Sequence, residues 1–219
     1  MIKGILDNTD AVIFDMDGSL VDSMWIWKQI DIEHFAMYGK ELPEDLQSKI
    51  EGMSFYQTAQ FIKENYGFPE SIEEMTELWN RMAHKKYSED VYFKKGVEHF
   101  LDVCVKRGIK LGIATSNSRF LYDAVSNHLG LDKYFDCVLT GSEILNGKPA
   151  PDVYLKAAER LNVAPERCLV FEDITKGIEA GHNAGMRVCA VDDEYSLHQK
   201  DDKKKMADYF IHDFTELEL

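Results

Sequence analysis

The chain has 219 residues, of which 45% are hydrophobic and 11% aromatic, enough apolar material for one large or two small globular domains. A formal net charge of −14 excludes the basic surplus that binding to nucleic acids or to anionic membranes requires. The N-terminus lacks the apolar segment of a secretory leader, no run approaches membrane-spanning length, and Cys104, Cys137, Cys168 and Cys189 form no CxxC pair. We therefore expect a reduced, cytoplasmic protein with buried cysteines.

An apolar run, Ala11–Phe14, is followed at once by two acidic residues. Asp15 and Asp17 stand two positions apart, and Gly18 comes next. Carboxylates at the end of an apolar run are costly unless they leave the core for a polar site. The run therefore predicts a strand that delivers two carboxylates at its end. A calcium-binding loop is excluded because Ile26 stands where that motif needs glutamate.

Residues 24–90 carry the apolar spacing of amphipathic helices, with no strand between them. Gly39 and Gly67 are predicted to end two of these helices, and Ser54 to cap the start of another. The predicted helices cover 24–38, 44–50, 54–66 and 72–87. A helical segment inserted directly after the first strand is expected to form a lid over the carboxyl end of a sheet.

From Val97 onward, short apolar runs alternate with helical patterns. The predicted strands are Ile109–Ala114, Cys137–Leu139, Cys168–Phe171, Arg187–Val191 and, at an edge, Tyr209–Ile211. The predicted helices cover 96–107, 118–129, 152–161, 176–184 and 197–206. This alternation predicts an α/β fold, a parallel sheet with helices on both faces. The charged run KDDKKK at 200–205 is predicted to be a solvated helix face.

Polar residues gather where the predicted strands end, which is where ligands of a parallel sheet bind. They are Asp15, Asp17, Thr115, Ser116, Asn117, Lys148, Glu172 and Asp173. Thr115, Ser118 or Asp173 alone could serve merely as a helix cap, and Lys148 alone could be solvated. These residues form four groups, one after each of four predicted strands. Their common placement at one sheet edge favours a functional site.

This combination of residue types is suited to phosphoryl transfer through a carboxylate. Aspartate can act as a covalent nucleophile, and a second acid can move the protons of the leaving group and of water. Attack by one anion on another requires positive charge, which Mg²⁺ bound by carboxylates and a lysine such as Lys148 can supply. Hydroxyl and amide groups near Thr115 can hold the phosphoryl oxygens.

The sequence resembles the haloacid dehalogenase-like superfamily, in its branch of phosphatases and β-phosphoglucomutase-like proteins. The motifs that carry the resemblance span nearly the whole chain: DMDGSLVDS at 15–23, ATSNS at 114–118, GKPAPD at 147–152 and FEDITKGIEAG at 171–181. The resemblance implies a Rossmann-like core of residues 1–22 and 91–219, with a small helical cap of residues 23–90 inserted after the first strand.

The resemblance also implies a role for each site residue. Asp15 would be the nucleophile, Asp17 the general acid/base, and Lys148 the lysine that balances charge. Phosphate would be bound by Gly18, Thr115, Ser116, Asn117 and Lys148. Mg²⁺ would be held by Asp15, by Asp17 through its backbone carbonyl, by Asp173, and by Glu172 directly or through water. The implied partner is a small phosphorylated metabolite, and we expect a monomer.

Departures from the family pattern separate the alternatives. Dehalogenases lack the second aspartate, which is present here as Asp17. The β-phosphoglucomutases resemble this chain at Gly52–Ser54, but carry an arginine where this chain has Phe55 and a histidine where it has Trp27; an aromatic ring cannot replace a bidentate cation. These differences favour a phosphatase of a sugar-phosphate-like metabolite over a hexose-phosphate mutase. A catalytically silent binding module is the third hypothesis.

Several aromatic residues gather early in the cap. Trp25, Trp27 and Phe55 could form the cap's own core, or one of them could line the substrate cleft. We expect at least one of the three to exclude water from the site and to shape the pocket for the leaving group.

Overall fold

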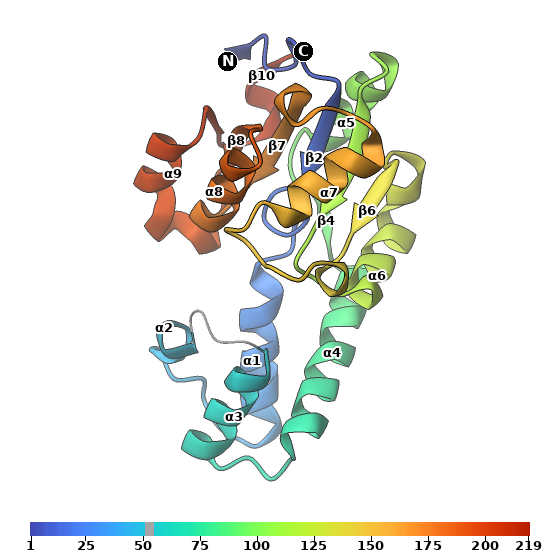
Figure 1. The fold of residues 1–219 in the computed structure, drawn as a ribbon. Coiled ribbons are helices and arrows are strands. Elements are labelled where there is room, and N and C mark those ends of the chain that lie inside the picture. Colours follow the sequence, from blue (N-terminus) through green and yellow to red (C-terminus); the bar gives the residue numbers. More distant parts are fainter. Residues whose placement is uncertain (51–54) are drawn as a thin grey trace. The chain divides into compact units, whose positions relative to one another are not determined.

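The computed structural model describes residues 1–50 and 55–219, and Figure 1 shows the course of the chain. The strands are β1 (Ile2–Lys3), β2 (Ala11–Phe14), β3 (Val21–Asp22), β4 (Tyr92–Phe93), β5 (Lys110–Ala114), β6 (Cys137–Leu139), β7 (Cys168–Glu172), β8 (Arg187–Val191), β9 (Tyr209–Ile211) and β10 (Leu217–Glu218). The α-helices are α1 (Trp25–Met37), α2 (Leu46–Ile50), α3 (Phe55–Tyr66), α4 (Ile72–Glu89), α5 (Val97–Lys106), α6 (Arg119–Leu129), α7 (Asp152–Leu161), α8 (Thr175–Asn183) and α9 (Lys200–Met206). Short 3-10 helices cover Leu131–Lys133, Gly141–Glu143, Pro165–Arg167, Glu194–Gln199 and Phe214–Glu216.

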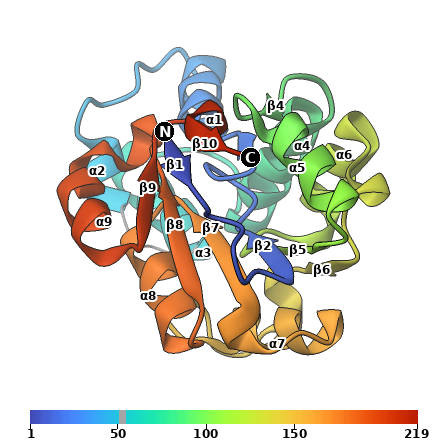
Figure 2. The same cartoon turned by 90° about the horizontal axis from the view of Figure 1, so that it is seen from above.

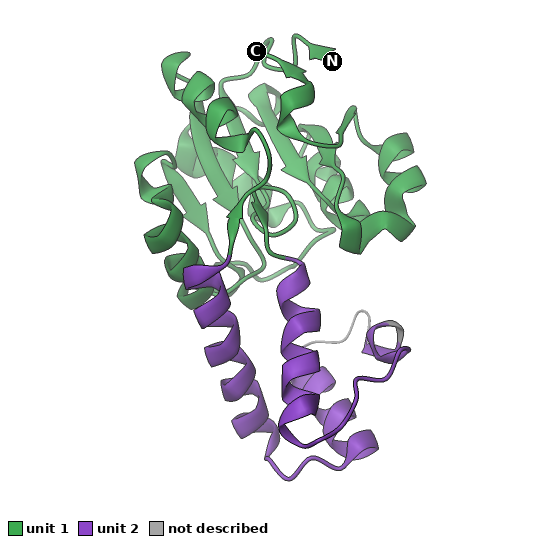
Figure 3. Ribbon diagram, turned by 180° about the vertical axis from the view of Figure 1, so that it is seen from behind, with its two compact units in different colours: residues 1–23, 91–219 green, residues 24–90 purple. Residues whose placement is uncertain are grey.

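The described residues form two compact units, coloured separately in Figure 3. Residues 1–23 and 91–219 form one, here called the core unit, and residues 24–90 form the other, here called the helical unit. Among the described residues, no helix combines the length and the apolar content that a membrane span requires. The four cysteines are free and buried, as the sequence predicted.

The core unit is built on a parallel six-stranded sheet in the order β6-β5-β2-β7-β8-β9. β2 pairs with β5 on one side and with β7 on the other, so the strand predicted from Ala11–Phe14 is central. β9 lies at the edge, as predicted. Figure 2 shows α7 and α8 on one face of the sheet and α5 on the other. The predicted α/β fold is therefore confirmed.

Both faces of the sheet are packed with apolar side chains, which explains why its strands read as continuous apolar runs. Ala11 and Ile13 of β2 belong to a core cluster with residues of α7 and α8. Phe14 faces the other side, where its ring stacks on Phe171 at a centroid distance of 5.1 Å and meets Phe100 of α5 edge-on at 6.1 Å. The central strand is thus held from both sides, and the position of its end is fixed.

Two pairs of very short strands were not predicted. β1 pairs with β10 in parallel, and β3 pairs with β4 in antiparallel register, with Val21 opposite Phe93 and Asp22 opposite Tyr92. Two-residue strands carry no hydrophobic period, so sequence patterns do not reveal them. The β3–β4 pair joins the segment where the chain leaves the core unit to the segment where it returns.

The charged run at 200–205 corrects the prediction of a wholly solvated helix face. Lys203 on α9 is fully buried. Its Nζ donates hydrogen bonds to the carbonyl oxygen of Val191 at 3.1 Å and to Ser196 Oγ at 2.8 Å. Burial lowers the pKa of Lys203. The prediction was wrong for Lys203 because acceptors at the end of β8 and in the 3-10 helix Glu194–Gln199 satisfy its ammonium group.

The helical unit is held together by the packing of α1 and α3 against α4. Ser71 caps α4 in a capping box, accepting from the Glu74 backbone N–H at 3.1 Å while the Glu74 side chain accepts from the Ser71 backbone N–H at 2.8 Å. Gly39 and Gly67 follow α1 and α3 with φ angles of +65° and +66°, which confirms them as helix ends. Ser54, predicted as a helix cap, and the rest of Gly52–Ser54 lie outside the described residues.

Asp31 is a buried carboxylate of the helical unit. It lies on α1, is 7% exposed, and accepts a hydrogen bond from Gln47 Nε2 at 2.7 Å. Burial raises the pKa of Asp31 from 3.8 to about 6, and the Gln47 hydrogen bond offsets only part of this effect. Folding therefore favours the protonated form of this carboxyl group.

We expect Asp31 to make the stability of the protein depend on pH. Its contribution is fully present below about pH 4 and is lost as the pH rises through about 6, because the folded-state pKa exceeds that of the unfolded chain. From about pH 4 to about pH 8, the wild-type protein is expected to lose up to about 3 kcal/mol of unfolding free energy relative to Asp31→Asn. Urea unfolding at a series of pH values, followed by tryptophan fluorescence, measures this difference.

Glu33→Gln on the same helix is the matched control. Although burial acts to raise the pKa of Glu33, hydrogen bonds from Lys86 and Gln29 lower it. Stability due to Glu33 is therefore lost as the pH falls, the trend opposite to that of Asp31. Wild-type and Asp31→Asn stability curves that run parallel over the same pH range would contradict the prediction.

Candidate active site

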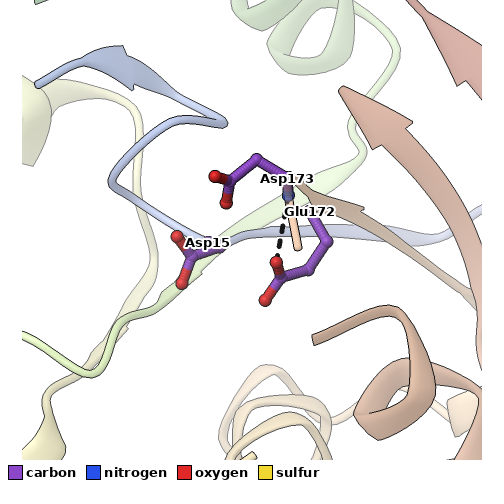
Figure 4. Close-up of side chains that lie close together, drawn as sticks. All are labelled: Asp15, Glu172 and Asp173. Atoms are coloured by element: carbon purple, nitrogen blue, oxygen red, sulfur yellow. Dashed lines mark hydrogen bonds between the residues drawn. The ribbon is translucent and has the colours of Figure 1, made fainter. Parts of the chain in front are cut away.

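Three carboxylates meet at the carboxyl edge of the central strands. Asp15 follows β2 directly, Glu172 is the last residue of β7, and Asp173 comes next. One oxygen from each side chain lies within 4.8 Å of the others, and all three residues are buried, as Figure 4 shows in close-up. Adjacent parallel strands in register end together, so the sequence prediction that these residues converge is borne out in the geometry.

Burial and neighbouring charges raise the pKa values of two of these carboxyl groups, Asp15 and Asp173. Burial raises the pKa of Asp15 to about 7; Lys148 acts against this, while the charges of Glu172 and Asp17 add to it. Burial also raises the pKa of Asp173 well above its ordinary value, with Glu172 and Asp15 contributing. A buried set of oxygen ligands that is unfavourable when fully ionised fits a hard divalent cation such as Mg²⁺, which would restore the ionised forms.

Lys148 provides the fixed positive charge beside this cluster. It lies in the loop before α7, and its Nζ is 2.5 Å from Asp15 Oδ1 and donates a second hydrogen bond to Glu172 Oε1. Although burial acts to lower the pKa of Lys148, the charges of Asp15 and Glu172 raise it well above the ordinary value. Lys148 therefore stays protonated, and its two ion pairs exclude the alternative that it is merely a solvated lysine.

Glu172 is saturated by donors from the protein itself. Its Oε1 accepts from Lys148 and, at 2.8 Å, from the Tyr154 hydroxyl, while its Oε2 accepts from the backbone N–H groups of Asp173 at 3.0 Å and Ile174 at 3.3 Å. A Cβ atom at position 177 would lie 1.8 Å from Glu172 Oε1, so only Gly177 leaves room for this side chain. Glu172 thus anchors Lys148 beside Asp15.

Tyr154 is a site residue that sequence reasoning missed. It lies on α7, is completely buried, and its ring is 5.2 Å from Lys148 Nζ. Its hydroxyl and its ring therefore contact two members of the cluster, Glu172 and Lys148. The position of Tyr154 two residues after Asp152 in GKPAPDVY was the available signal, but an aromatic residue on an apolar helix face usually indicates only core packing.

Asp17 is held by two side chains rather than by the acidic cluster. Its Oδ1 accepts a hydrogen bond from Ser23 Oγ at 2.6 Å, and its Oδ2 accepts one from Asn117 Nδ2 at 2.9 Å. Gly18, the next residue, has a φ of +76°, which glycine adopts without strain. Both oxygens of Asp17 are thus oriented, and the Asn117 side chain is engaged with Asp17.

The remaining predicted phosphate ligands surround one cavity in the core unit. Thr115, Ser116 and Lys148 line a cavity of about 190 Å³ together with Gly141 and Gly147. The Thr115 Oγ1 accepts a hydrogen bond from the backbone N–H of Asn117 at 3.0 Å, which fixes the hydroxyl oxygen at the end of β5. The structure therefore brings a hydroxyl group, a backbone turn and a cation to the same space.

The three aromatic residues of which at least one was predicted to line the substrate pocket lie in the helical unit. The rings of Trp27 and Phe55 contact each other with a centroid distance of 5.6 Å, and both line a cavity inside that unit. Trp25 lies elsewhere, with Lys86 Nζ 6.0 Å from its ring centroid. That one of these residues contacts a substrate stays a prediction.

Comparison with known proteins agrees with this architecture. A family model described as haloacid dehalogenase-like hydrolase matches residues 12–191. The phosphorylated carbohydrates phosphatase of Thermotoga maritima is 35% identical over 177 residues, covering 81% of this chain and 82% of that protein. The crystal structure of CbbY from Rhodobacter sphaeroides in complex with phosphate has a TM-score of 0.80 at 23% identity, covering 95% of this chain and 96% of that one. The crystal structure of a β-phosphoglucomutase from Clostridium difficile has a TM-score of 0.73 at 25% identity, covering 96% of this chain and 94% of that one.

Proposed function

This chain belongs to the haloacid dehalogenase-like hydrolases, and we propose that it is a Mg²⁺-dependent phosphatase that hydrolyses a small, sugar-phosphate-like metabolite through a phosphorylated Asp15. The observation that carries the proposal is the convergence of Asp15, Asp173 and Lys148 at the end of the central strands. The name of the 35% identical relative, a phosphatase of phosphorylated carbohydrates, supports the substrate class.

In the proposed reaction, an Asp15 carboxylate oxygen attacks phosphorus, and the bond from phosphorus to the leaving oxygen breaks. Asp17 donates its proton to that oxygen, so that the product leaves as an alcohol. Asp17 then takes a proton from water, the water oxygen attacks the phosphorus of the aspartyl phosphate, and inorganic phosphate leaves with Asp15 regenerated. Ser23 and Asn117 would orient the Asp17 carboxylate for these proton transfers.

The remaining residues would neutralise charge and hold the phosphoryl group. Lys148 would balance the charge of Asp15, with Glu172 fixing its position. Phosphoryl oxygens would be bound by Lys148 and by groups of the loops after β2 and β5, namely Gly18, Thr115, Ser116 and Asn117. Of these residues, Thr115, Ser116 and Lys148 line one cavity. Asp15, Asp173 and the backbone carbonyl of Asp17 would hold Mg²⁺, whose charge would make nucleophilic attack on an anion feasible.

Release of inorganic phosphate from a panel of metabolites tests the proposal. The panel contains sugar phosphates, polyol phosphates, nucleotides and amino-acid phosphates, each assayed with Mg²⁺. We expect release from one or more sugar or polyol phosphates at a kcat/KM well above that for p-nitrophenyl phosphate. Absence of phosphate release from every compound would contradict the proposal and favour the silent binding module.

A hexose-phosphate mutase is the second candidate, because a β-phosphoglucomutase shares this fold. Incubation with β-glucose 1-phosphate separates the two activities: a mutase forms glucose 6-phosphate, whereas a phosphatase releases inorganic phosphate. We expect phosphate release, because the mutase-like arginine and histidine positions are occupied by Phe55 and Trp27.

Tyr154→Phe is expected to lower kcat about tenfold with little change in KM, because loss of the hydroxyl leaves Glu172 and Lys148 less firmly oriented. Hydrolysis of p-nitrophenyl phosphate at saturating Mg²⁺ measures the effect. Tyr122→Phe is the matched control, since Tyr122 is also buried in the core unit but donates to Asp132. Equal losses of activity in the two variants would indicate a general packing defect.

Trp27→Ala and Phe55→Ala are expected to change the preference among substrates by about tenfold, because we propose that these rings shape the pocket for the leaving group. Hydrolysis of p-nitrophenyl phosphate should stay within about threefold of wild type, since the phosphoryl-binding residues are untouched. Ratios of kcat/KM across the panel measure the effect. Reduced stability with unchanged substrate ratios would show that both residues are structural.

A further inference from the structure

The helical unit contains a cavity of its own, distinct from the acidic cluster of the core unit. Its volume is about 150 Å³, and its lining includes Trp27, Asp31, Gln47, Phe55, Thr58 and Trp79. This volume is below the roughly 300 Å³ of a pocket for a whole drug-sized ligand, so the cavity suits a small head group. Its lining combines three aromatic rings and two isoleucine side chains, Ile30 and Ile50, with one carboxylate.

The aromatic rings form walls at steep angles to one another. Phe55 lies between the two tryptophans, with centroid distances of 5.6 Å to Trp27 and 5.3 Å to Trp79 and interplanar angles of 73° and 68°. The orientation of the Trp79 ring is fixed by a hydrogen bond that its Nε1 donates to His34 Nδ1 at 3.1 Å. Rings placed in this way can offer their electron-rich faces to one positively charged group.

Asp31 gives the cavity a negative charge that the described residues do not balance. Within the described part of the chain its hydrogen-bond partner is Gln47, and no lysine or arginine forms an ion pair with it. A carboxylate can accept about four hydrogen bonds, so Asp31 can accept further hydrogen bonds from a ligand. An unpaired buried carboxylate is costly, and a cation is the partner that relieves this cost most directly.

We propose that this cavity binds an ammonium group of a small molecule, with the cation against the faces of Trp27, Phe55 and Trp79 and paired with Asp31. A neutral hydroxyl group would use the hydrogen-bonding capacity of Asp31 but not the faces of the rings. A phosphate group in this cavity would be repelled by the carboxylate of Asp31. The net charge of −14 also favours the approach of cations over anions.

Titration of the full-length protein with choline and with its neutral isostere 3,3-dimethylbutan-1-ol, at matched ionic strength, tests the proposal. A Trp25→Phe variant is used, because Trp27 and Trp79, the other two of the three tryptophans, both line the cavity and then report binding by their fluorescence. Choline is expected to bind at least about tenfold more tightly than the isostere. Equal affinities, or no saturable signal with either choline or ethanolamine, would overturn the proposal.

Asp31→Asn assigns the effect to the carboxylate. It keeps an oxygen that can accept from Gln47, so the fold is conserved while the charge is lost. We expect choline affinity to fall about tenfold or more. Glu77→Gln, on the exposed face of α4, removes one charge from the same unit and should leave the affinity within about twofold. The same loss in both variants would show a non-specific charge effect and overturn the assignment.

The ammonium group could belong to the substrate or to a free amine, and rates distinguish these sources; this arm rests on the proposed phosphatase function. If it belongs to the substrate, kcat/KM for glucosamine 6-phosphate should exceed that for glucose 6-phosphate at least about tenfold, and the ratio should approach one in Asp31→Asn. If choline binds and the ratio is near one in both proteins, the ligand is a free amine. If no phosphomonoester is hydrolysed, the proposed function fails, while the choline titration still decides the proposal for the cavity.

Discussion

Replacing Asp15 with asparagine is expected to lower kcat for phosphomonoester hydrolysis by at least about 10⁴-fold, because an amide is a poor nucleophile and cannot form the phosphorylated intermediate. The substitution nearly conserves volume. The fold should be retained, since the backbone N–H of residue 15 still donates to the Phe171 carbonyl oxygen at 2.9 Å. Initial rates of phosphate release measure the effect, and intact-mass analysis of rapidly quenched samples should detect a phosphorylated form only in the wild-type protein.

Asp10→Asn is the matched control for this experiment. Asp10 comes directly before β2 and Asp15 directly after it, so the two acids lie at opposite ends of the same strand. Asp10 pairs with Arg167, whose nitrogen lies 2.7 Å from its carboxylate. We expect kcat to stay within about twofold of wild type, because an exposed ion pair contributes little. Near-normal hydrolysis by Asp15→Asn would remove Asp15 from the proposed mechanism.

Removal of divalent cations by a chelator is expected to reduce hydrolysis by at least about 10³-fold, and added Mg²⁺ should restore it. Without a cation, burial holds the pKa of Asp15 at about 7 and that of Asp173 well above its ordinary value, so both carboxyl groups tend to be protonated. Binding of Mg²⁺ should therefore release protons near neutral pH, which calorimetry in buffers of different ionisation enthalpy measures.

A second measurement separates metal binding from catalysis. Saturation with Mg²⁺ at about 100 times its dissociation constant should stabilise the folded protein by about 2.7 kcal/mol, seen as a higher melting temperature. Asp173→Asn should lose most of this shift, whereas Asp10→Asn should keep it. Full hydrolytic activity in chelator, or an equal melting shift in both variants, would contradict the proposed metal site.

The central strand and the ends of its neighbours were predictable because the information is local. The run Ala11–Phe14 is apolar at every position, and a strand covered on both faces requires this. In a parallel sheet, the ends of adjacent strands meet at one edge. This rule alone places Asp15 and Asp173 at the same edge. The helix ends at Gly39 and Gly67 were predictable for a similar reason, since left-handed backbone favours glycine.

Features that depend on which side chains meet in the folded protein could not be predicted. Tyr154 reaches Glu172 across 18 positions, and Asn117 reaches Asp17 across 100. Lys203 is buried only because Val191 and Ser196 present acceptors to it. In the sequence, Tyr154 and Lys203 have ordinary local explanations, namely core packing and a solvated lysine. The position of Asn117 at the sheet edge was predicted, but its hydrogen bond to Asp17 was not.

The antiparallel pairing of β3 with β4 brings together the two chain segments that bound residues 24–90. Val21 lies opposite Phe93 and Asp22 opposite Tyr92, so the two chain segments that bound residues 24–90 run side by side within the core unit. Paired residues of antiparallel strands have Cα atoms about 5 Å apart, a gap that a hairpin turn of two residues spans. Any insert whose ends can meet at that spacing could therefore be grafted between residues 23 and 91 without shifting the register of the parallel sheet. We therefore expect the β3–β4 pair to tolerate exchange of the segment between residues 23 and 91 while the reacting groups of the core unit stay in place.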